Sequence, residues 1–267
     1  VAISYKIIPS LSRVSGNYQT IKNYSSSLIK IHDEIINNKV INDDREIISF
    51  FNKKVSINKL FFKYGNSKTI FNNFKFEINK NETIGLIGDS GSGKTTLLDI
   101  ITGLHNDFVG ELKIDDKNLN SSNSLWKPKV GYVSQRTFLF QDTIRNNIVM
   151  SNLSNEINEE LLEKAISASS LSNWIKSLPH GINSNVGQEG SNISEGQKQR
   201  IGIARSLYLN PEILIFDEPT SSLDLSTSQE IFNTIYSMKG KKTIIIVSHT
   251  PSDLSNCDRI INLNEKL

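Results

Sequence analysis

Several features that would assign a chain to a particular class are scarce or missing here. The only cysteine among 267 residues is Cys257, so an internal disulfide is excluded and a reducing compartment is favoured. No run of 18 apolar residues and no signal-peptide pattern occurs, so these residues alone do not span a membrane. The 30 lysines and arginines form no block and nearly balance 28 acidic residues, so we expect no nucleic-acid partner. The composition, 37% hydrophobic and 22% charged, is enough for one full core and an appendage.

The N-terminal stretch has apolar residues at alternating steps of four and three, which predicts one long amphipathic helix over residues 7–35. The stripe consists of Ile7, Leu11, Val14, Tyr18, Ile21, Leu28 and Ile35. Pro9 predicts a bend or an entry point, because proline lacks a backbone donor. Polar residues 37–44 predict a linker, and we place the domain boundary between residues 48 and 49. On the pattern alone, a packing helix without its own function is the alternative.

The stretch Gly88-Asp-Ser-Gly-Ser-Gly-Lys-Thr95 fits the pattern GxxxxGK[ST] at every fixed position. It lies between a strand-like run, Thr83–Ile87, and a helix-like run, Thr95–Leu104, which is the context that a phosphate-binding loop needs. Unpaired amides and the dipole at the helix start favour an anion. The lysine can reach the β and γ phosphates, and the threonine hydroxyl can bind Mg2+. The predicted nucleotide-binding residues here are Gly88, Asp89, Ser90, Gly91, Ser92, Gly93, Lys94, Thr95 and Thr96.

Further elements follow from apolar runs and turn residues. Strands are expected over residues 55–64, 74–78, 111–114 and 129–135, and a helix is expected over residues 156–178. Tyr64 ends the first of these strands and Gln135 ends the last. Ser194 and Gln197 have capping-box spacing at the start of a helix that continues to Tyr208. That start is either a well-capped helix terminus or a second place to hold phosphate.

Two later apolar runs end at groups that suit metal binding or acid–base chemistry. Residues 211–217 end at adjacent carboxylates, Asp217 and Glu218, and residues 243–248 are followed by His249. Buried parallel strands would bring these side chains to their shared carboxyl edge, where ligands of open α/β sheets bind. A lone histidine after a strand is more often structural, so His249 is a candidate functional residue only because the same predicted sheet carries the phosphate-binding loop.

The motifs together resemble the ATP-binding cassette of ABC transporters in both order and spacing, from about residue 50 to residue 267. They are Gly88–Thr95, Gln135, Ser194–Arg200, Ile213–Glu218, Ser222–Asp224 and His249. The resemblance implies an α/β P-loop core, a small antiparallel sheet around Tyr64, and a helical subdomain over about residues 136–202. It also implies an ATPase that uses ATP and Mg2+.

By that resemblance, each site draws on two chains. Within one chain, Tyr64 stacks on adenine, and the implied catalytic residues are Lys94, Gln135, Glu218 and His249. Glu218 is the implied general base, and Thr95, Gln135 and Asp217 are the implied metal residues. The residues implied to act across the dimer are Ser194, Gly196, Gln197 and Asp224. One departure from the family motif LSGGQ is Glu195, whose carboxylate suits a helix N-terminus but brings negative charge near a partner's phosphate.

The subtype also rests on resemblance. Residues 131–148 and the loop Gly187–Gly190 look like exporters that fuse membrane helices to the cassette, and residues 7–13 look like flippases of lipid-linked oligosaccharides. On that reading the first 48 residues are the tail of a transmembrane domain, and the native chain begins upstream of Val1. A homodimer on the cytoplasmic face of the plasma (inner) membrane is then expected. The alternatives are an importer ATPase and a soluble, non-transport ABC ATPase.

Overall fold

The computed structural model describes residues 2–37, 46–65, 69–105, 108–119, 124–150 and 157–264. The chain forms two compact units, residues 1–44 and 45–267. The first described strand, β1 (Glu46–Ile48), pairs with β7 (Ser124–Trp126) and so belongs to the second unit. The described residues Glu46–Ile48, which the predicted boundary assigned to the tail, therefore lie in the second unit, while most of the predicted linker lies outside the described residues.

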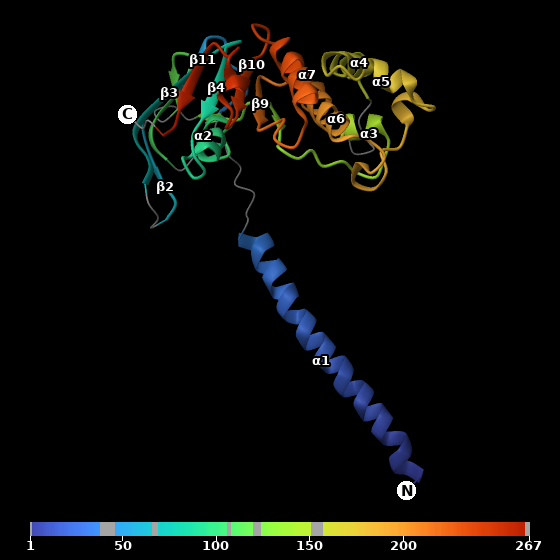
Figure 1. Cartoon of the computed structure of the whole chain (residues 1–267). Helices are drawn as coiled ribbons and strands as arrows, with labels where there is room; N and C mark the ends of the chain where they lie inside the picture. The colour runs from blue at the N-terminus through green and yellow to red at the C-terminus, as the bar shows by residue number, and fades with distance from the viewer. Residues whose placement is uncertain are drawn as a thin grey trace. The chain divides into compact units, whose positions relative to one another are not determined.

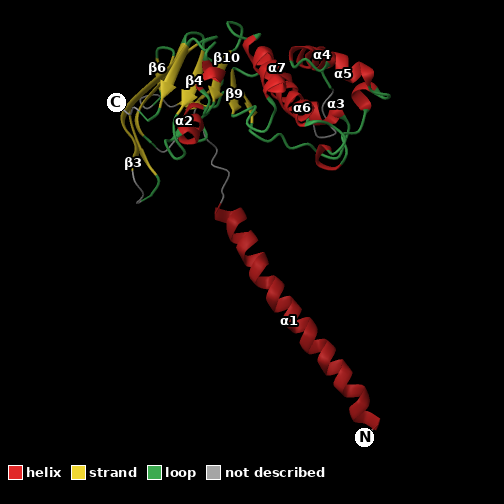
Figure 2. Ribbon diagram, in the orientation of Figure 1, coloured by secondary structure: helices red, strands yellow, loops and turns green. Residues whose placement is uncertain are grey.

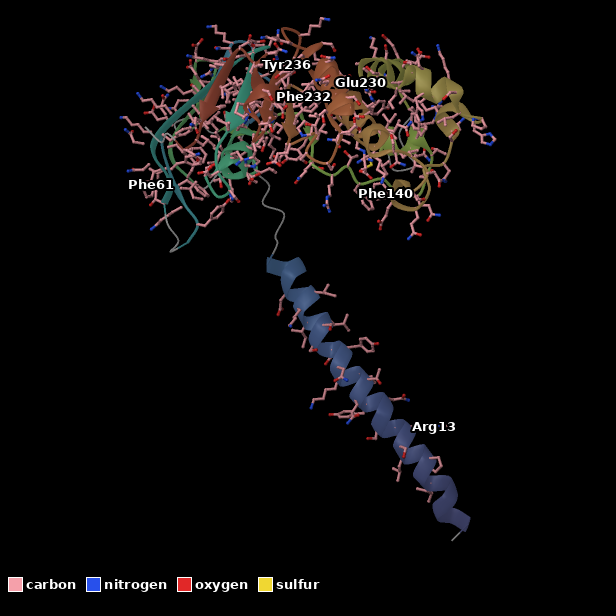
Figure 3. All side chains as sticks on the ribbon, viewed as in Figure 1. Arg13, Phe61, Phe140, Glu230, Phe232 and Tyr236 are labelled. Atoms are coloured by element: carbon pink, nitrogen blue, oxygen red, sulfur yellow. The ribbon has the colours of Figure 1, made fainter. Side chains whose placement is uncertain are left out.

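The first unit is the long helix α1 (Ala2–Asn37), which confirms the predicted N-terminal helix (Figure 1). It begins before Pro9 and continues through it, so Pro9 is not the entry point. Within the described part of the stripe, Leu11, Val14 and Tyr18 are 62%, 66% and 67% exposed. Figure 3 shows side chains projecting from α1 along its length, Arg13 among them. In the parts of the chain that the structure describes, no helix has the length and hydropathy needed to cross a membrane.

The second unit is built on a parallel five-stranded sheet in the order β11-β4-β10-β9-β8 (Figure 2). Its strands are β4 (Thr83–Ile87), β8 (Val130–Val133), β9 (Ile213–Asp217), β10 (Thr243–Val247) and β11 (Arg259–Asn262). The three central strands are almost wholly buried, because helices or the second sheet cover both faces. This explains why they occur in the sequence as continuous apolar runs.

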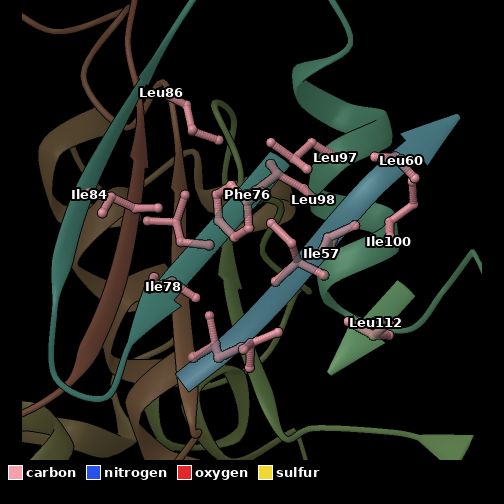
Figure 4. Close-up of a cluster of buried hydrophobic side chains, with 14 of the residues drawn as sticks. Ile57, Leu60, Phe76, Ile78, Ile84, Leu86, Leu97, Leu98, Ile100 and Leu112 are labelled. Carbon is pink, nitrogen blue, oxygen red and sulfur yellow. The ribbon is translucent and has the colours of Figure 1, made fainter. Parts of the chain in front are cut away.

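A four-stranded antiparallel sheet, in the order β3-β2-β5-β6, lies next to this parallel sheet. Its strands are β2 (Lys54–Lys63), β3 (Thr69–Asn79), β5 (Val109–Ile114) and β6 (Lys117–Asn118). Helix α2 (Lys94–Ile101) packs between the sheets, with its Leu97 and Ile100 in one cluster with Ile57 of β2 and Ile84 of β4 (Figure 4). The opposite face of the parallel sheet packs on α7 (Leu225–Tyr236), where Ile231 contacts the cluster around Phe216.

Helical elements form the remaining layer of the second unit. They are α3 (Ile144–Val149), α4 (Glu159–Ala168), α5 (Ser172–Ser177) and α6 (Glu195–Tyr208), with short 3-10 turns at Gly181–Asn183 and Gln188–Gly190. Another 3-10 turn, Pro251–Leu254, packs against β4 of the parallel sheet. The single helix expected over residues 156–178 is wrong, because Ser170 adopts φ 58° between α4 and α5 and breaks it. The predicted α/β cassette with an antiparallel sheet and helical elements is confirmed.

Trp126 joins β7 to α2 and generates a stability prediction. Its ring is 1% exposed, contacts Phe51 edge-on, and donates Nε1–H to the carbonyl of Ile101 at 2.6 Å. Trp126→Ala should lower the free energy of unfolding by about 3–5 kcal/mol through the cavity it leaves. Trp126→Phe keeps most of the packing and should cost less, because the lost hydrogen bond is worth only about 1 kcal/mol net. Urea denaturation measures both, and equal losses would contradict a packing role.

Candidate functional site

The loop between β4 and α2 closes around an open centre because its glycines adopt left-handed backbone angles. Gly91 and Gly93 have φ of 79° and 104°, which side chains other than hydrogen rarely allow. A Cβ on Gly93 would lie 2.6 Å from Ile70 Cγ2 and 2.8 Å from Phe71 Cζ, whereas a Cβ on Gly91 would meet no atom within 4 Å. Gly93 is therefore required both by its angle and by the strand β3 behind it.

Polar groups of the same loop are arranged as an anion cradle. The Lys94 ammonium donates to the carbonyls of Gly88 and Asp89 at 2.5 and 3.0 Å, so its charge lies over the loop. The Asp89 amide donates to Asn264 Oδ1 at 3.0 Å, which ties the loop to the segment after β11. Ser92 Oγ is buried and, among the described atoms, has no hydrogen-bond partner. This hydroxyl lies against Gly88, where an added Cβ would be 2.6 Å from it, so the loop amides and Lys94 rather than Ser92 are the groups placed to hold an anion.

A pocket of about 410 Å³ brings most of the predicted residues together. Those that line it are Tyr64, Ser90, Gly91, Gly93, Lys94, Thr95, Thr96, Gln135, Asp217, Glu218 and His249, together with Ile70, which sequence reasoning missed. Gly88, Asp89 and Ser92 belong to the same loop without lining the pocket. The residues expected to act across a dimer are not among its lining residues.

Both carboxylates, Asp217 and Glu218, reach the pocket from the end of β9, and His249 reaches it from the end of β10. Asp217 is in register with Val247, and the Glu218 amide donates to the Val247 carbonyl at 3.0 Å. Glu218 has φ 50°, a strained conformation that is typical of functional positions. Its Oε1 lies 2.6 Å from Nε2 of His249. Two groups that the sequence placed on different strands are thus in direct contact at the pocket.

Tyr132 on β8 is a site neighbour that sequence reasoning missed. Its hydroxyl donates to Asp217 Oδ2 at 2.5 Å, and partial burial, with this hydrogen bond, raises the Tyr132 pKa above its ordinary value. Tyr132 pairs with Ile215, two residues before Asp217, on the adjacent parallel strand. This strand register could have identified Tyr132 as a neighbour of Asp217, but the sequence alone does not show that β8 and β9 are adjacent in the sheet.

Tyr64 follows β2 and presents a ring, 44% exposed, to the pocket. It packs edge-on against Phe62 with ring centroids 4.9 Å apart. Its hydroxyl lies 3.3 Å from both Thr96 Oγ1 and His105 Nε2. The ring that could stack on a base is therefore held from two sides, and His105 is a further residue that the sequence did not single out.

The donor set at the pocket suits Mg2+ in its chemistry. Thr95, Gln135 and Asp217 supply a hydroxyl, an amide and a carboxylate oxygen, which are the ligands that a hard cation prefers. Within the described ranges, no group of three or more His, Cys, Asp or Glu side chains is placed to hold a metal. A cation here would thus depend on oxygens of a bound phosphate as well as on the protein.

Ser194, Gly196, Gln197 and Asp224 lie at two helix starts outside the pocket. Ser194 and Gln197 form the predicted capping box, with bonds of 2.9 and 3.3 Å. A Cβ on Gly196 would lie 2.6 Å from Thr227 Cγ2, so the starts of α6 and α7 adjoin. Asp224 caps α7, and hydrogen bonds from Ser226 and Thr227 lower its pKa.

Glu195, the departure from the common motif, is paired within its own helix. Its carboxylate lies 2.7 Å from the ammonium of Lys198, three residues on. Lys198 is only 17% exposed, so its charge is held close to the start of α6. The negative charge introduced by Glu195 is therefore balanced locally.

A phosphate loop between strand and helix, with carboxylates at the ends of neighbouring parallel strands, defines a P-loop nucleotide-binding protein. The model of the ABC transporter family matches residues 71–221. The chain is 36% identical, over 93% of its length, to the multidrug resistance-like ATP-binding protein MdlA of Buchnera aphidicola subsp. Schizaphis graminum. It belongs to the ABC transporter family and carries the family's ATP-binding domain.

Other relatives have exporter names. The chain is 33% identical, over 97% of its length, to the leukotoxin export ATP-binding protein LtxB of Aggregatibacter actinomycetemcomitans. It is 36% identical, over 78% of its length, to the ATP-dependent lipid A-core flippase of Francisella tularensis subsp. holarctica. A bacterial Atm1-family ABC exporter with ATP bound is similar in structure over 92% of this chain and 43% of that one, with 26% identity and a TM-score of 0.73. The chain spans 43%, 37% and 34% of the lengths of MdlA, LtxB and the flippase.

The two loop glycines give a matched prediction. Gly91→Ala adds a methyl group at positive φ in open space, whereas Gly93→Ala adds one at positive φ against Ile70 and the rigid Phe71 ring. Both should lose about 1–2 kcal/mol of unfolding free energy to backbone strain. Gly93→Ala should lose about 1–3 kcal/mol more from overpacking. Thermal unfolding checks this, and equal stability of the two variants would contradict the described approach of β3 to the loop.

Proposed function

We propose that this chain is the ATP-hydrolysing motor domain of an ABC exporter or flippase, which dimerises on ATP. The observation that carries the proposal is the division of the motifs between two surfaces. The phosphate loop, the base-stacking candidate and the carboxylates share one pocket, while the capping motif at Ser194 lies outside it. A second cassette would bring its own Ser194 to the nucleotide. The exporters among the relatives support this reading.

Some of the pocket residues bind the nucleotide, and others take part in its hydrolysis. The loop amides and Lys94 hold the β and γ phosphates, and Tyr64 stacks on the adenine. Mg2+, when bound near Thr95, Gln135 and Asp217, neutralises phosphate charge. Glu218 accepts a proton from the attacking water, and His249 orients Glu218 and faces the γ phosphate. Phosphoryl transfer depends chiefly on such positioning and electrostatics.

The rest of the proposed machine lies in other chains or segments. The partner is a second copy of the cassette, contacted through Ser194, Gly196, Gln197 and Asp224. We propose that residues 1–48 are the tail of a transmembrane domain fused upstream, which places the cassette on the cytoplasmic face of the plasma (inner) membrane. The exposed apolar stripe of α1 supports this, because a tail of a larger domain would be covered there. A lipid-linked oligosaccharide is the cargo we propose, and the flippase relative supports a lipid cargo.

Tyr64 tests the base-binding role. Tyr64→Ala should weaken ATP binding about 5- to 150-fold, because stacking on an aromatic is worth about 1–3 kcal/mol. Turnover at saturating ATP should persist. Tyr64→Phe keeps the ring and loses only the hydroxyl bonds, so its affinity should stay near the wild-type value. Isothermal titration calorimetry measures these affinities, and an unchanged dissociation constant in Tyr64→Ala would remove Tyr64 from the site.

Glu218 tests the catalytic mechanism. Glu218→Gln leaves Lys94, Thr95 and Asp217 intact, so ATP binding should survive while hydrolysis falls about 100- to 10,000-fold, the usual scale for a lost general base. Because ATP would join two cassettes that only hydrolysis releases, the variant should accumulate as an ATP-dependent dimer in size-exclusion chromatography.

Two control variants accompany Glu218→Gln, one at the opposite end of β9 and one in the phosphate loop. Glu212 immediately precedes β9, at the end of the strand opposite Glu218, and pairs with Lys80, so Glu212→Gln should keep normal turnover and form no trapped dimer. Lys94→Ala should lose both ATP binding and dimerisation. Near-normal hydrolysis in Glu218→Gln, or no ATP-driven dimer of that variant, would count against the base and the two-cassette mechanism.

A further inference from the structure

The buried side-chain amide of Gln199, on α6, forms hydrogen bonds to a residue before Gln135 and to a residue after it in the chain. Its Oε1 accepts a hydrogen bond from Thr137 Oγ1 at 2.8 Å, and its Nε2 donates to the Ser134 carbonyl at 3.1 Å. The side chain is 4% exposed, and both of its ends are satisfied by this one short segment. The two bonds therefore bracket the residue that lines the nucleotide pocket.

The same segment also contacts α6 one turn further along the helix, where Thr137 lies directly against Gly202. A Cβ on Gly202 would lie 2.5 Å from Oγ1 and 2.9 Å from Cγ2 of Thr137, so only glycine lets Thr137 lie against the helix. Ser134 closes the segment on itself by donating its hydroxyl to the Arg136 carbonyl at 2.8 Å. We define residues 134–137, held by Gln199 and Gly202, as the α6 clasp.

The clasp connects two places that the proposed function uses. Ser194 caps the start of α6, and Gln199 lies five residues later, about 7.5 Å along the axis at 1.5 Å per residue. A helix moves as one body over that distance, so a displacement of Ser194 also displaces the clasp. Gln135 then moves relative to Thr95 and Asp217, which sit on the core sheet side of the pocket.

We propose that Gln199 is a positioning residue that holds Gln135 at the nucleotide pocket and couples it to the partner-facing start of α6. The proposal rests on the proposed ATPase function. Gln199 acts through Gln135 and touches no substrate. Its hydrogen bonds matter because the clasp lies at the border between the helical elements and the parallel sheet, where β8 ends and no strand pairing continues.

Hydrogen exchange in the nucleotide-free chain gives a readout that does not depend on activity. Gln199→Leu and Thr137→Val should each raise amide exchange over residues 134–138 by about 10-fold, roughly the effect of losing one hydrogen bond. Exchange over residues 83–98 should not change. Thr234→Val is the matched control, because Thr234 is another threonine whose hydroxyl is hydrogen-bonded to α6, through Arg200. It should leave exchange over residues 134–138 unchanged.

A double-mutant cycle then tests whether the effect passes through Gln135. Gln199→Leu should lower the ATP turnover number about 10-fold with little change in ATP affinity, and Gln135→Ala should lower it at least as much. The double variant should be no slower than Gln135→Ala alone, because the two residues act in series. A double variant slower by the product of the single effects, or unchanged exchange over residues 134–138 in both clasp variants, would overturn the proposal. A wild-type chain without ATPase activity would instead overturn the proposed function, and the exchange experiment would still decide the clasp.

Discussion

The carboxyl ends of β4, β10, β9 and β8 lie along one edge of the parallel sheet, and the candidate site depends on this alignment. Hydrogen bonding between β10 and its two neighbours sets Val247 level with Leu86 on one side and with Asp217 on the other. The phosphate loop after β4 and the carboxylates after β9 therefore face the same pocket. A slip of one residue in β9 would turn Asp217 to the other face of the sheet. Burial of these strands on both faces opposes such a slip.

The antiparallel sheet contributes to the same pocket from the other side of α2. Its β2 and β3 bring Tyr64 and Ile70 to the pocket, and the cluster around Ile57 and Leu97 fixes the sheet on the helix. The start of α2 thus shares the pocket with Tyr64, the candidate for stacking on the base, and with Asp217 at the edge of the parallel sheet. The contacts that pack the core also fix the geometry of the site, because α2, which presents Lys94, contributes Leu97 and Ile100 to the hydrophobic cluster between the two sheets.

Helix α6 links this pocket to the surface that we propose for the partner. Its capped start carries Ser194, its middle holds the segment around Gln135 through Gln199, and Arg200 pairs with Glu230 of α7 at 2.7 Å. Because α6 is rigid over these residues, contacts at its start and geometry at Gln135 are mechanically connected. The local pairing of Glu195 with Lys198 also shows how this chain keeps the charge at the helix start balanced without the common glycine.

Local chemistry in the sequence was sufficient for much of this molecule. Gly91 and Gly93 permit left-handed backbone angles, Ser194 and Gln197 can satisfy each other's amides, and uninterrupted apolar runs such as Ile213–Asp217 favour buried strands, all without reference to distant residues. These features predicted the loop, the helix start and the central strands. The three-residue strand β1 was missed, because its pairing with β7 links segments that carry no local pattern.

Only the tertiary structure decided which side chains meet. Tyr132 and Asp217 are 85 residues apart, and Thr137 and Gln199 are 62 apart, yet each pair shares a hydrogen bond. His249 contacts Glu218 because β10 and β9 are neighbours, and Tyr64 meets His105 because β2 folds over α2. Local propensity fixes backbone angles and buried faces over a few residues. The order of strands in a sheet is settled by packing of the whole core, and the contacts across that order follow from it.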